Sequence, residues 1–276
     1  MSATRPDLYG LLGYPLGHTL SPAMHQAALA WAGLPGSYMA LPVPPDRLEG
    51  AMAGVRAWRL PGLNVTVPHK TAVIPFLDGL TPQAEALGAV NTLFWDGDRL
   101  LGDNTDYAGF LESLPPELPA DVTVTILGAG GAARAVAAAM RDRGASAIHL
   151  AARNLEQAAS LRADLLAATP GEILRPDDPA LGARFAQSGM LINATPVGMN
   201  GHSLPPGAEQ LALLPASAWV YDLIYNPAEP PLLATARARG LRCQNGLDML
   251  LCQAAAAFER WTGRKPPLSL LREAVG

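Results

Sequence analysis

Hydrophobic and polar positions follow two different patterns along the chain. In the first part, short runs in which apolar residues alternate with polar ones predict half-buried strands. Cap-then-proline pairs such as Ser21-Pro22 and Thr81-Pro82 predict helix starts, and Asp96-Gly97 predicts a hairpin turn. Together these signals predict a mixed α/β domain. Its strands are expected at Leu8–Gly13, Ser37–Val43, Leu63–Val67, Asn91–Trp95 and Arg99–Leu101.

The pattern of hydrophobic and polar residues changes after a proline-rich connector at Leu114–Pro119. Val122–Leu127 consists of apolar residues and two threonines without a charge, which is typical of a strand buried on both faces of a parallel sheet. Helical segments then alternate with further strands, an order that predicts a parallel sheet with right-handed crossovers. A final helix over Leu247–Trp261 carries one apolar stripe, so we expect it to pack on a core. The later strands are expected at Ala147–Ala151, Met190–Asn193 and Trp219–Leu223.

The composition is that of a globular protein with two domains. The chain has 276 residues, of which 49% are hydrophobic and 16% charged, and its net charge is −4. No basic stripe suits a nucleic acid and no apolar run is long enough to cross a membrane, so we expect neither partner. The first residues lack the apolar segment of a signal peptide. Two cysteines outside metal-ligand spacing, Cys243 and Cys252, and five scattered histidines predict no metal site and favour a reduced, cytoplasmic setting.

A glycine-rich turn between a predicted strand and a predicted helix indicates a dinucleotide site. In Gly128-x-Gly130-x-x-Ala133, the first glycine allows a tight turn and the second lets the backbone approach a pyrophosphate. The helix start offers free N–H groups to the phosphates. Arg153 follows the next strand, where NAD sites usually place an acid, so it favours the 2′-phosphate of NADP. The alternatives are a glycine turn without a ligand and an arginine that is merely exposed.

The segment that ends in Lys70 carries the first candidate for catalysis. The predicted strand Leu63–Val67 presents an amide, Asn64, and a hydroxyl, Thr66, and Pro68 then ends its hydrogen-bond ladder. Lys70 follows at the strand's end, where α/β sheets build their sites. A lysine in this place can hold a hydroxyl-rich ligand and move a proton. The alternative is a hydrated lysine at a helix start.

The second candidate is Asp106, in the polar segment Gly102–Asp106 after the hairpin. An ammonium and a carboxylate that meet share their titration, and the ammonium can stabilise and protonate a carbonyl oxygen during hydride transfer. We therefore expect Lys70 and Asp106 to converge. The alternative for Asp106 is that it caps the helix that follows, and His69 is interpreted as a loop histidine rather than a base.

Eight phrases occur along the chain in a fixed order: Gly13–His25, Asn64–Lys70, Gly88–Thr92, Gly102–Asp106, Gly128–Ala133, Asn193–Met199, Asp222–Pro227 and Gly246–Gln253. In these phrases the chain resembles the shikimate dehydrogenase family over nearly its whole length. The resemblance implies an N-terminal mixed α/β domain that binds the substrate, a Rossmann-type domain with a parallel sheet that binds NADP, and a cleft between them. Residues 1–106 and 246–276 would form the substrate-binding catalytic domain, and 107–245 the NADP-binding domain.

The resemblance also implies roles for individual residues. Lys70 and Asp106 would be the catalytic pair in the reversible reduction of 3-dehydroshikimate to shikimate with NADPH, a step of aromatic amino acid synthesis. The last helix would fold back onto the first domain and bring Gln253 to the site. The substrate-binding residues would be Thr19, Ser21, Asn64, Thr66, Asn91, Tyr225 and Gln253. The cofactor-binding residues would be Gly128, Ala129, Gly130, Gly131, Ala132, Arg153, Thr195, Met199 and Gly246.

Departures from the family pattern keep other functions open. Thr19 stands where the family usually has serine, and Ser21 has a second interpretation as a helix cap before Pro22. Gln157 stands where a second basic residue is common near the 2′-phosphate. A relative that prefers quinate or NAD is the nearest alternative, and a module that binds NADP without turnover is the third. A homodimer is left open as the assembly.

Overall fold

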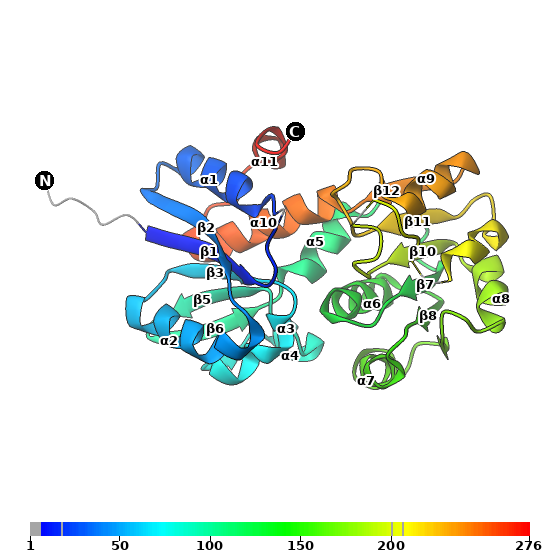
Figure 1. The fold of residues 1–276 in the computed structure, drawn as a ribbon, viewed down its shortest axis with the longest axis horizontal. Coiled ribbons are helices and arrows are strands. Elements are labelled where there is room, and N and C mark those ends of the chain that lie inside the picture. The colour runs from blue at the N-terminus through cyan, green and yellow to red at the C-terminus, as the bar shows by residue number, and fades with distance from the viewer. Residues whose placement is uncertain (1–6, 18, 200, 206) are drawn as a thin grey trace, which may run out of the picture. The chain divides into compact units, whose positions relative to one another are not determined.

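The structure is a computed structural model that describes residues 7–17, 19–199, 201–205 and 207–276. The expectation for the first residues and position His18 of the Gly13–His25 phrase therefore lie outside the described residues. The chain forms two compact units (Figure 1). Unit 1 comprises Met1–Gly109 and Leu251–Gly276, and unit 2 comprises Phe110–Leu250. The expected domain limits lie three to five residues from these divisions.

Unit 1 is built on a mixed six-stranded sheet with the order β2-β1-β3-β5-β6-β4. β1 pairs in parallel with both β2 and β3, whereas β3, β5 and β6 pair antiparallel and β4 joins β6 in parallel. The mixed sheet and the predicted hairpin are therefore confirmed. The strands are β1 (Asp7–Gly13), β2 (Gly36–Pro42), β3 (Gly62–Val65), β4 (Gly79–Leu80), β5 (Thr92–Asp96) and β6 (Arg99–Asp103).

Strand β3 differs from the half-buried strand that the sequence predicts. Leu63, Asn64 and Val65 are all buried, and the strand ends at Val65, whereas Val67 is 67% exposed. The reason is its place in the sheet, because β3 is an inner strand with β1 on one side and β5 on the other. A central strand covered on both faces has no solvent side, so a polar residue such as Asn64 must find partners inside the protein.

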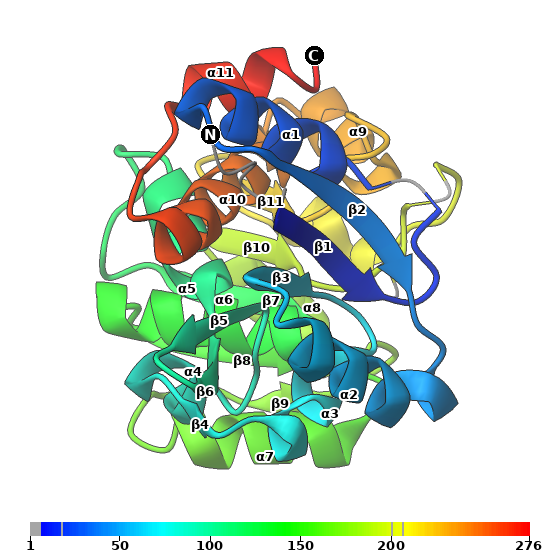
Figure 2. The same cartoon turned by 90° about the vertical axis from the view of Figure 1, so that its left-hand side faces the viewer.

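Helices cover both faces of this sheet. Residues of α2 join Leu12, Leu63 and Leu93 in one apolar cluster, and Figure 1 shows α1 and α2 on opposite sides of the strands. The helix nearest the C-terminus, α11, lies beside α1 (Figure 2). Thr81 caps its helix by accepting a hydrogen bond from Ala84 N, as its place before a proline predicts. The helices are α1 (Ser21–Ala32), α2 (Leu48–Trp58), α3 (His69–Ala72), α4 (Pro82–Leu87) and α11 (Leu268–Glu273), with the start of α5 (Thr105–Ser113) and most of α10 (Leu247–Thr262).

Unit 2 has the parallel sheet that the alternation of strands and helices in the second part of the chain predicts. Its order, β12-β11-β10-β7-β8-β9, is the doubly wound arrangement of dinucleotide-binding domains. All five strand pairs are parallel. Its strands are β7 (Thr123–Leu127), β8 (Ala147–Ala151), β9 (Ile173–Leu174), β10 (Met190–Asn193), β11 (Trp219–Asp222) and β12 (Arg242–Asn245).

The helices of unit 2 lie on both sides of its sheet, as right-handed crossovers require (Figure 1). Residues Ala135–Met140 are all buried, because these small side chains let α6 approach the sheet closely. Among the described helices of the whole chain, none combines the length and hydropathy that a bilayer crossing requires. The helices of unit 2 are α6 (Gly131–Arg143), α7 (Leu155–Leu165), α8 (Ala180–Gln187) and α9 (Pro231–Ala238).

Candidate active site

Unit 1 brings Lys70 and Asp106 together. Lys70 lies on α3, just after β3, and Asp106 lies in the first turn of α5, just after β6. The Lys70 Nζ atom is 2.5 Å from Asp106 Oδ2, and the two side chains are 15% and 8% exposed. The interpretation of Lys70 as a hydrated surface lysine is therefore wrong. A short ion pair with little exposure fixes the positions of the ammonium and the carboxylate relative to each other.

The carboxylate of Asp106 is not used for helix capping. Asn104 does that work, because its Oδ1 atom accepts a hydrogen bond from Asp106 N at 3.1 Å. The capping interpretation of Asp106 is wrong for this reason. Its Oδ1 atom instead accepts a hydrogen bond from Asn91 Nδ2 at 2.9 Å, while Oδ2 faces Lys70. Both oxygens are thus held by donors on other elements, which fixes the carboxylate's orientation.

Asn91 is the centre of the network behind the ion pair. Besides Asp106, its Nδ2 atom donates to Thr105 Oγ1 at 3.0 Å and to Gln253 Oε1 at 3.4 Å. Its Oδ1 atom accepts from Thr105 N at 2.8 Å and from Thr92 Oγ1 at 2.9 Å. Gln253 is 9% exposed, so the interpretation of it as a solvated helix position is wrong. The last helix does fold back onto the first sheet, as the resemblance implies.

The remaining substrate candidates of unit 1 lie at the same end of its sheet. Ser21 is buried inside the first turn of α1 and makes no cap hydrogen bond, so its capping interpretation is wrong. Thr19 binds the backbone at this helix start instead. Its Oγ1 atom accepts a hydrogen bond from Ser21 N at 3.2 Å and also lies 3.2 Å from Ser21 Oγ. Asn64 is buried on β3, and Thr66 follows that strand with its N–H bonded to Leu12 O.

His69 is a structural histidine. It is 1% exposed, and its Nε2 atom lies 2.6 Å from the carbonyl oxygen of Val43. Since a carbonyl only accepts, Nε2 carries the proton and the ring fixes the loop after β2. In the part of the chain that the structure describes, no group of three His, Cys, Asp or Glu side chains is placed to hold a metal ion.

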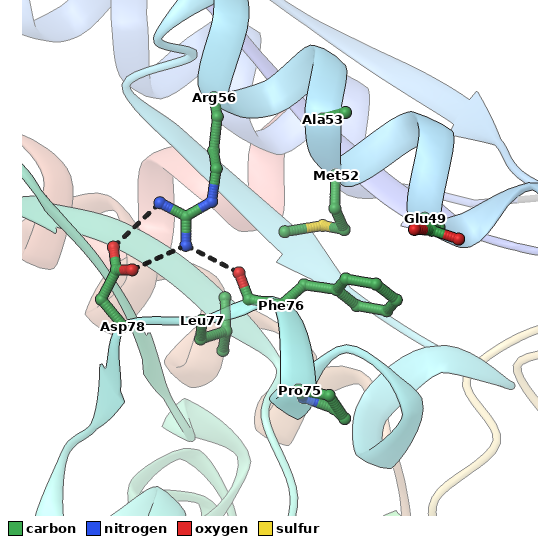
Figure 3. A pocket seen from close by; sticks show the side chains of 8 residues that line it. All are labelled: Glu49, Met52, Ala53, Arg56, Pro75, Phe76, Leu77 and Asp78. Carbon is green, nitrogen blue, oxygen red and sulfur yellow. Dashed lines mark hydrogen bonds and ion pairs between the residues drawn. The ribbon is translucent and has the colours of Figure 1, made fainter.

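A separate hollow of unit 1 has no part in this network. It is an open groove of about 350 Å³ between α2 and the segment before β4 (Figure 3). Its cation, Arg56, is already bound to Asp78 at 2.9 and 3.0 Å and to Phe76 O at 2.8 Å. We assign it a structural role. The lining residues are Glu49, Met52, Ala53, Arg56, Pro75, Phe76, Leu77 and Asp78.

Unit 2 carries the glycine turn of the expected cofactor site. Gly128 has a φ of +109°, and a Cβ atom there would lie 3.1 Å from Ala194 O, so the turn requires glycine. A Cβ atom on Gly130 would meet nothing within 4 Å, which leaves open space in front of the start of α6. Ala133 is fully buried against the sheet. Ala129 is buried, and Gly131 and Ala132 form the partly exposed first turn of α6. The glycine turn and this first turn therefore fit a dinucleotide phosphate.

Arg153 lies directly after β8 and is exposed. The next residue, Asn154, caps α7 by accepting a hydrogen bond from Gln157 N at 3.0 Å. Within the described ranges, no hydrogen bond or ion pair holds the Arg153 guanidinium. Its charge is therefore available to a phosphate, whereas Gln157 adds no second charge.

The loops after β10 and β11 are held by two residues that sequence reasoning passed over. Asp222 is fully buried, and its Oδ1 atom accepts from Asn193 Nδ2 at 2.9 Å and from Ile224 N at 3.0 Å. Asn193 Oδ1 in turn accepts from Thr195 Oγ1 at 2.7 Å. Burial raises the pKa of the Asp222 carboxyl to about 7, and these hydrogen bonds offset only part of the rise. Both residues belong to the matched phrases, but no local pattern marks them as loop anchors.

The other candidates of unit 2 occupy different settings. Met199 is 58% exposed and Tyr225 is half-buried. Gly246 begins the turn into α10, and a Cβ atom there would lie 2.0 Å from Leu223 O, so a larger residue cannot stand in its place. Gly246 is thus required by the turn itself, whatever else it contacts.

Comparisons with known proteins decide the family. A family model described as the shikimate dehydrogenase substrate binding domain matches residues 11–93, and one described as the shikimate 5′-dehydrogenase C-terminal domain matches residues 246–275. The curated shikimate dehydrogenase (NADP(+)) of Symbiobacterium thermophilum is 44% identical over 97% of this chain and 93% of its own. The chain belongs to the shikimate dehydrogenase family.

Solved structures of this family share the fold. The shikimate 5-dehydrogenase of Thermus thermophilus, in complex with NADP(H) and shikimate, is 38% identical with a TM-score of 0.85, covering 97% of this chain and 98% of that one. The quinate dehydrogenase of Corynebacterium glutamicum, in complex with NAD, is 31% identical with a TM-score of 0.86, covering 98% of both. The predicted fold class, a mixed sheet joined to a Rossmann-type parallel sheet, is confirmed.

Proposed function

We propose that this protein catalyses the reversible reduction of 3-dehydroshikimate to shikimate with NADPH, in the synthesis of chorismate and the aromatic amino acids. The observation that carries the proposal is the 2.5 Å contact between Lys70 Nζ and Asp106 Oδ2 in a largely buried setting. Curated relatives of this family bear the name shikimate dehydrogenase (NADP(+)), one of them at 44% identity. The site and the relatives therefore indicate the same chemistry.

The proposed roles of the pair follow from charge. Bound NADPH supplies the hydride. As the hydride reaches the carbonyl carbon, negative charge grows on the carbonyl oxygen, and the Lys70 ammonium stabilises that oxygen and protonates it. Asp106 holds the ammonium in place, while Asn91 fixes Asp106. In the reverse direction, the pair removes the proton of the alcohol.

The proposed binding residues divide between the units. Thr19 and Ser21 would donate hydroxyl hydrogens to the substrate carboxylate, with Tyr225 near it. Asn64, Thr66, Asn91 and Gln253 would bind ring hydroxyls or orient the pair. Arg153 would bind the 2′-phosphate of NADP. The cofactor would also be lined by Gly128, Ala129, Gly130, Gly131, Ala132, Thr195, Met199 and Gly246.

The two parts of the chain are proposed to bind different molecules. Residues 1–106 and 246–276 would bind the substrate, and 107–245 would bind NADP, close to the two compact units. A cytoplasmic location is proposed because the chain has only two cysteines, Cys243 and Cys252, as is usual for proteins of a reducing compartment. A homodimer is the proposed assembly to test by light scattering.

The direct test mixes the purified protein with shikimate and NADP+ and follows the absorbance of the reduced nicotinamide. Lys70→Ala should lower kcat at least ~100-fold and leave the KM for NADP+ nearly unchanged. Lys265→Ala removes an exposed lysine of the same unit and is the matched control, expected to retain full activity. A wild-type protein that turns over neither NADP+ nor NAD+ with shikimate would end the proposal.

A quinate or NAD preference is the second candidate. It is favoured by the likeness to a quinate dehydrogenase that binds NAD, and by Gln157 beside Arg153. The ratio of kcat/KM across two substrates and two cofactors separates it from the first. A module that binds NADP without turnover is the remaining alternative, and cofactor binding with no product in any combination would identify it.

A further inference from the structure

Tyr38 contacts the proposed substrate site although no sequence motif includes it. It lies on β2 and is 5% exposed, and its hydroxyl oxygen is 2.8 Å from Asn64 Oδ1 on β3. Strand β1 lies between these two strands, with Tyr9 paired to Tyr38 on one side and to Gly62 on the other. Tyr38, Gly62 and Asn64 therefore share one face of the sheet, and the long phenol reaches diagonally across β1.

The direction of these hydrogen bonds is fixed by chemistry. Asn64 Nδ2 faces the carbonyl oxygen of Asn91 at 3.3 Å, which can only accept, so the amide cannot be turned around. Its Oδ1 atom therefore faces Tyr38, and the phenol donates its single hydrogen to it. Nδ2 also lies 3.4 Å from Thr92 Oγ1. Since both Nδ2 contacts are long, the 2.8 Å bond from Tyr38 is the strongest that holds the Asn64 side chain.

The network that begins at Tyr38 leads toward the proposed catalytic pair. Burial raises the pKa of the phenol well above its usual value, so the hydroxyl keeps its proton and remains a donor. Its hydrogen bond is to Asn64, which is proposed to bind a ring hydroxyl. Asn64 continues to the backbone of Asn91, whose side chain holds Asp106.

Aromatic packing keeps the phenol in its plane. The His25 ring stacks on Tyr38 with centroids 4.3 Å apart and an interplanar angle of 11°. His25 is 1% exposed, and burial lowers its pKa to about 3, with the Asn64 amide offsetting only a part, so the ring is neutral. Neither ring nitrogen makes a hydrogen bond of normal geometry to a described residue. The Trp261 ring also packs against His25, with ring centroids 5.2 Å apart.

We propose that Tyr38 is a positioning residue that orients the Asn64 amide for the substrate. The inference rests on the proposed function, because it assigns Asn64 to the substrate. Tyr38 itself does not touch the reacting atoms. Its contribution is specific to the substrate and does not extend to the cofactor, for which unit 2 supplies the proposed contacts.

The test is Tyr38→Phe, which keeps the ring stack and removes only the hydroxyl. Loss of one neutral hydrogen bond should lower kcat/KM for shikimate about 3- to 10-fold, mainly through KM, with the KM for NADP+ unchanged and a small fall in melting temperature, because the buried Asn64 oxygen loses its donor. Tyr9→Phe makes the same chemical change one strand away on the same face and should leave kcat/KM as in wild type. In an Asn64→Ala background, Tyr38→Phe should have no further effect, because its action passes through Asn64.

Three outcomes would overturn the inference. The first is kcat/KM within about twofold of wild type in Tyr38→Phe. The second is additivity of the Tyr38 and Asn64 changes. The third is an equal change in the KM for NADP+, which would make Tyr38 a core residue only. A wild-type protein without turnover of shikimate would instead sink the proposed function, so the two failures are distinguishable.

Discussion

The buried carboxyl of Asp222 should make a contribution to the stability of the protein that depends on pH in an unusual direction. Asp222 is fully buried, and its Oδ2 atom has no hydrogen-bond partner among the described residues. Burial raises its pKa from 3.8 to about 7. Asp222→Asn is the informative change, since the amide keeps an oxygen for Asn193 and Ile224 but cannot ionise.

The sign follows from proton binding. Between about pH 4 and pH 7, folded Asp222 keeps a proton that the unfolded chain has lost, so its contribution to the free energy of unfolding falls as pH rises. The contribution is complete below the unfolded pKa of 3.8 and is lost as pH rises through about 7. At about 1.4 kcal/mol per pKa unit the whole effect is about 4 kcal/mol, and more than half of it falls between pH 5 and pH 8.

His25 acts in the opposite direction and conceals this slope in the wild-type protein. Its pKa is lowered from 6.5 to about 3, so folded His25 stays neutral while the unfolded chain gains a proton below about pH 6.5. Its contribution is present above pH 6.5 and is lost as pH falls, by about 2 kcal/mol between pH 8 and pH 5. The two effects nearly cancel, so only the difference between wild type and variant reveals Asp222.

The assay is urea unfolding followed by circular dichroism at pH 5 and pH 8. The free energy of unfolding of wild type minus that of Asp222→Asn should be about 2–3 kcal/mol larger at pH 5 than at pH 8. The control is Asp177→Asn, the same change at an exposed carboxylate of unit 2. The difference in free energy of unfolding between wild type and this variant should be equal at pH 5 and pH 8. A difference for Asp222→Asn that changes by less than about 0.5 kcal/mol would refute the assignment of a raised pKa.

Two further predictions concern single positions. Arg153→Ala removes an exposed guanidinium, so we expect the KM for NADP+ to rise about 10- to 100-fold with the KM for NAD+ unchanged; equal rises in steady-state assays would count against a 2′-phosphate contact. Gly62→Ala places a Cβ atom 2.4 Å from the Trp261 ring and should cost about 1–3 kcal/mol in urea unfolding. Gly54→Ala, with open space around its Cβ atom, is the control and should lose no stability.

Much of the fold could be predicted because its signals are local. The predicted strand at Met190–Asn193 has the observed limits, and the glycine turn after β7 leads into a helix as predicted. The strand that begins near Leu63 is shorter than predicted and fully buried rather than half-exposed. The alternation of Leu63, Asn64 and Val65 does not show that β1 and β5 flank the strand, because those partners are set by pairing between distant segments.

The site was predictable in its residues but not in its connections. The lysine and the carboxylate could be named from their phrases, yet their meeting depends on contacts across 36 positions. The contact of Asn91 with Gln253 spans 162 positions, and nothing near either residue indicates it. Tyr38 was missed because a tyrosine in a strand is ordinary, and its meaning depends on which residue lies across β1.

The incorrect capping interpretations of Ser21 and Asp106 share one cause. Both residues begin helices after strand ends, where a hydroxyl or a carboxylate is usually the cap. At these places a residue two positions earlier accepts the hydrogen bond from the backbone N–H instead, in a local turn that Ser, Thr, Asn and Asp form readily. The pairs are Thr19 with Ser21, Asn104 with Asp106, Asn193 with Thr195, and Asp222 with Ile224.

This division of tasks has a consequence for chemistry. A carboxylate that caps a helix is stabilised by backbone N–H groups and is less able to share a proton. Asn104 is the residue that caps α5, and both Asp106 oxygens are held by Asn91 and Lys70. Thr19 Oγ1 accepts from Ser21 N and donates to Ser21 Oγ, so it fixes the side chain of Ser21 as well as the start of α1. The polar residue that precedes each site residue by two positions therefore helps to set where that site residue lies.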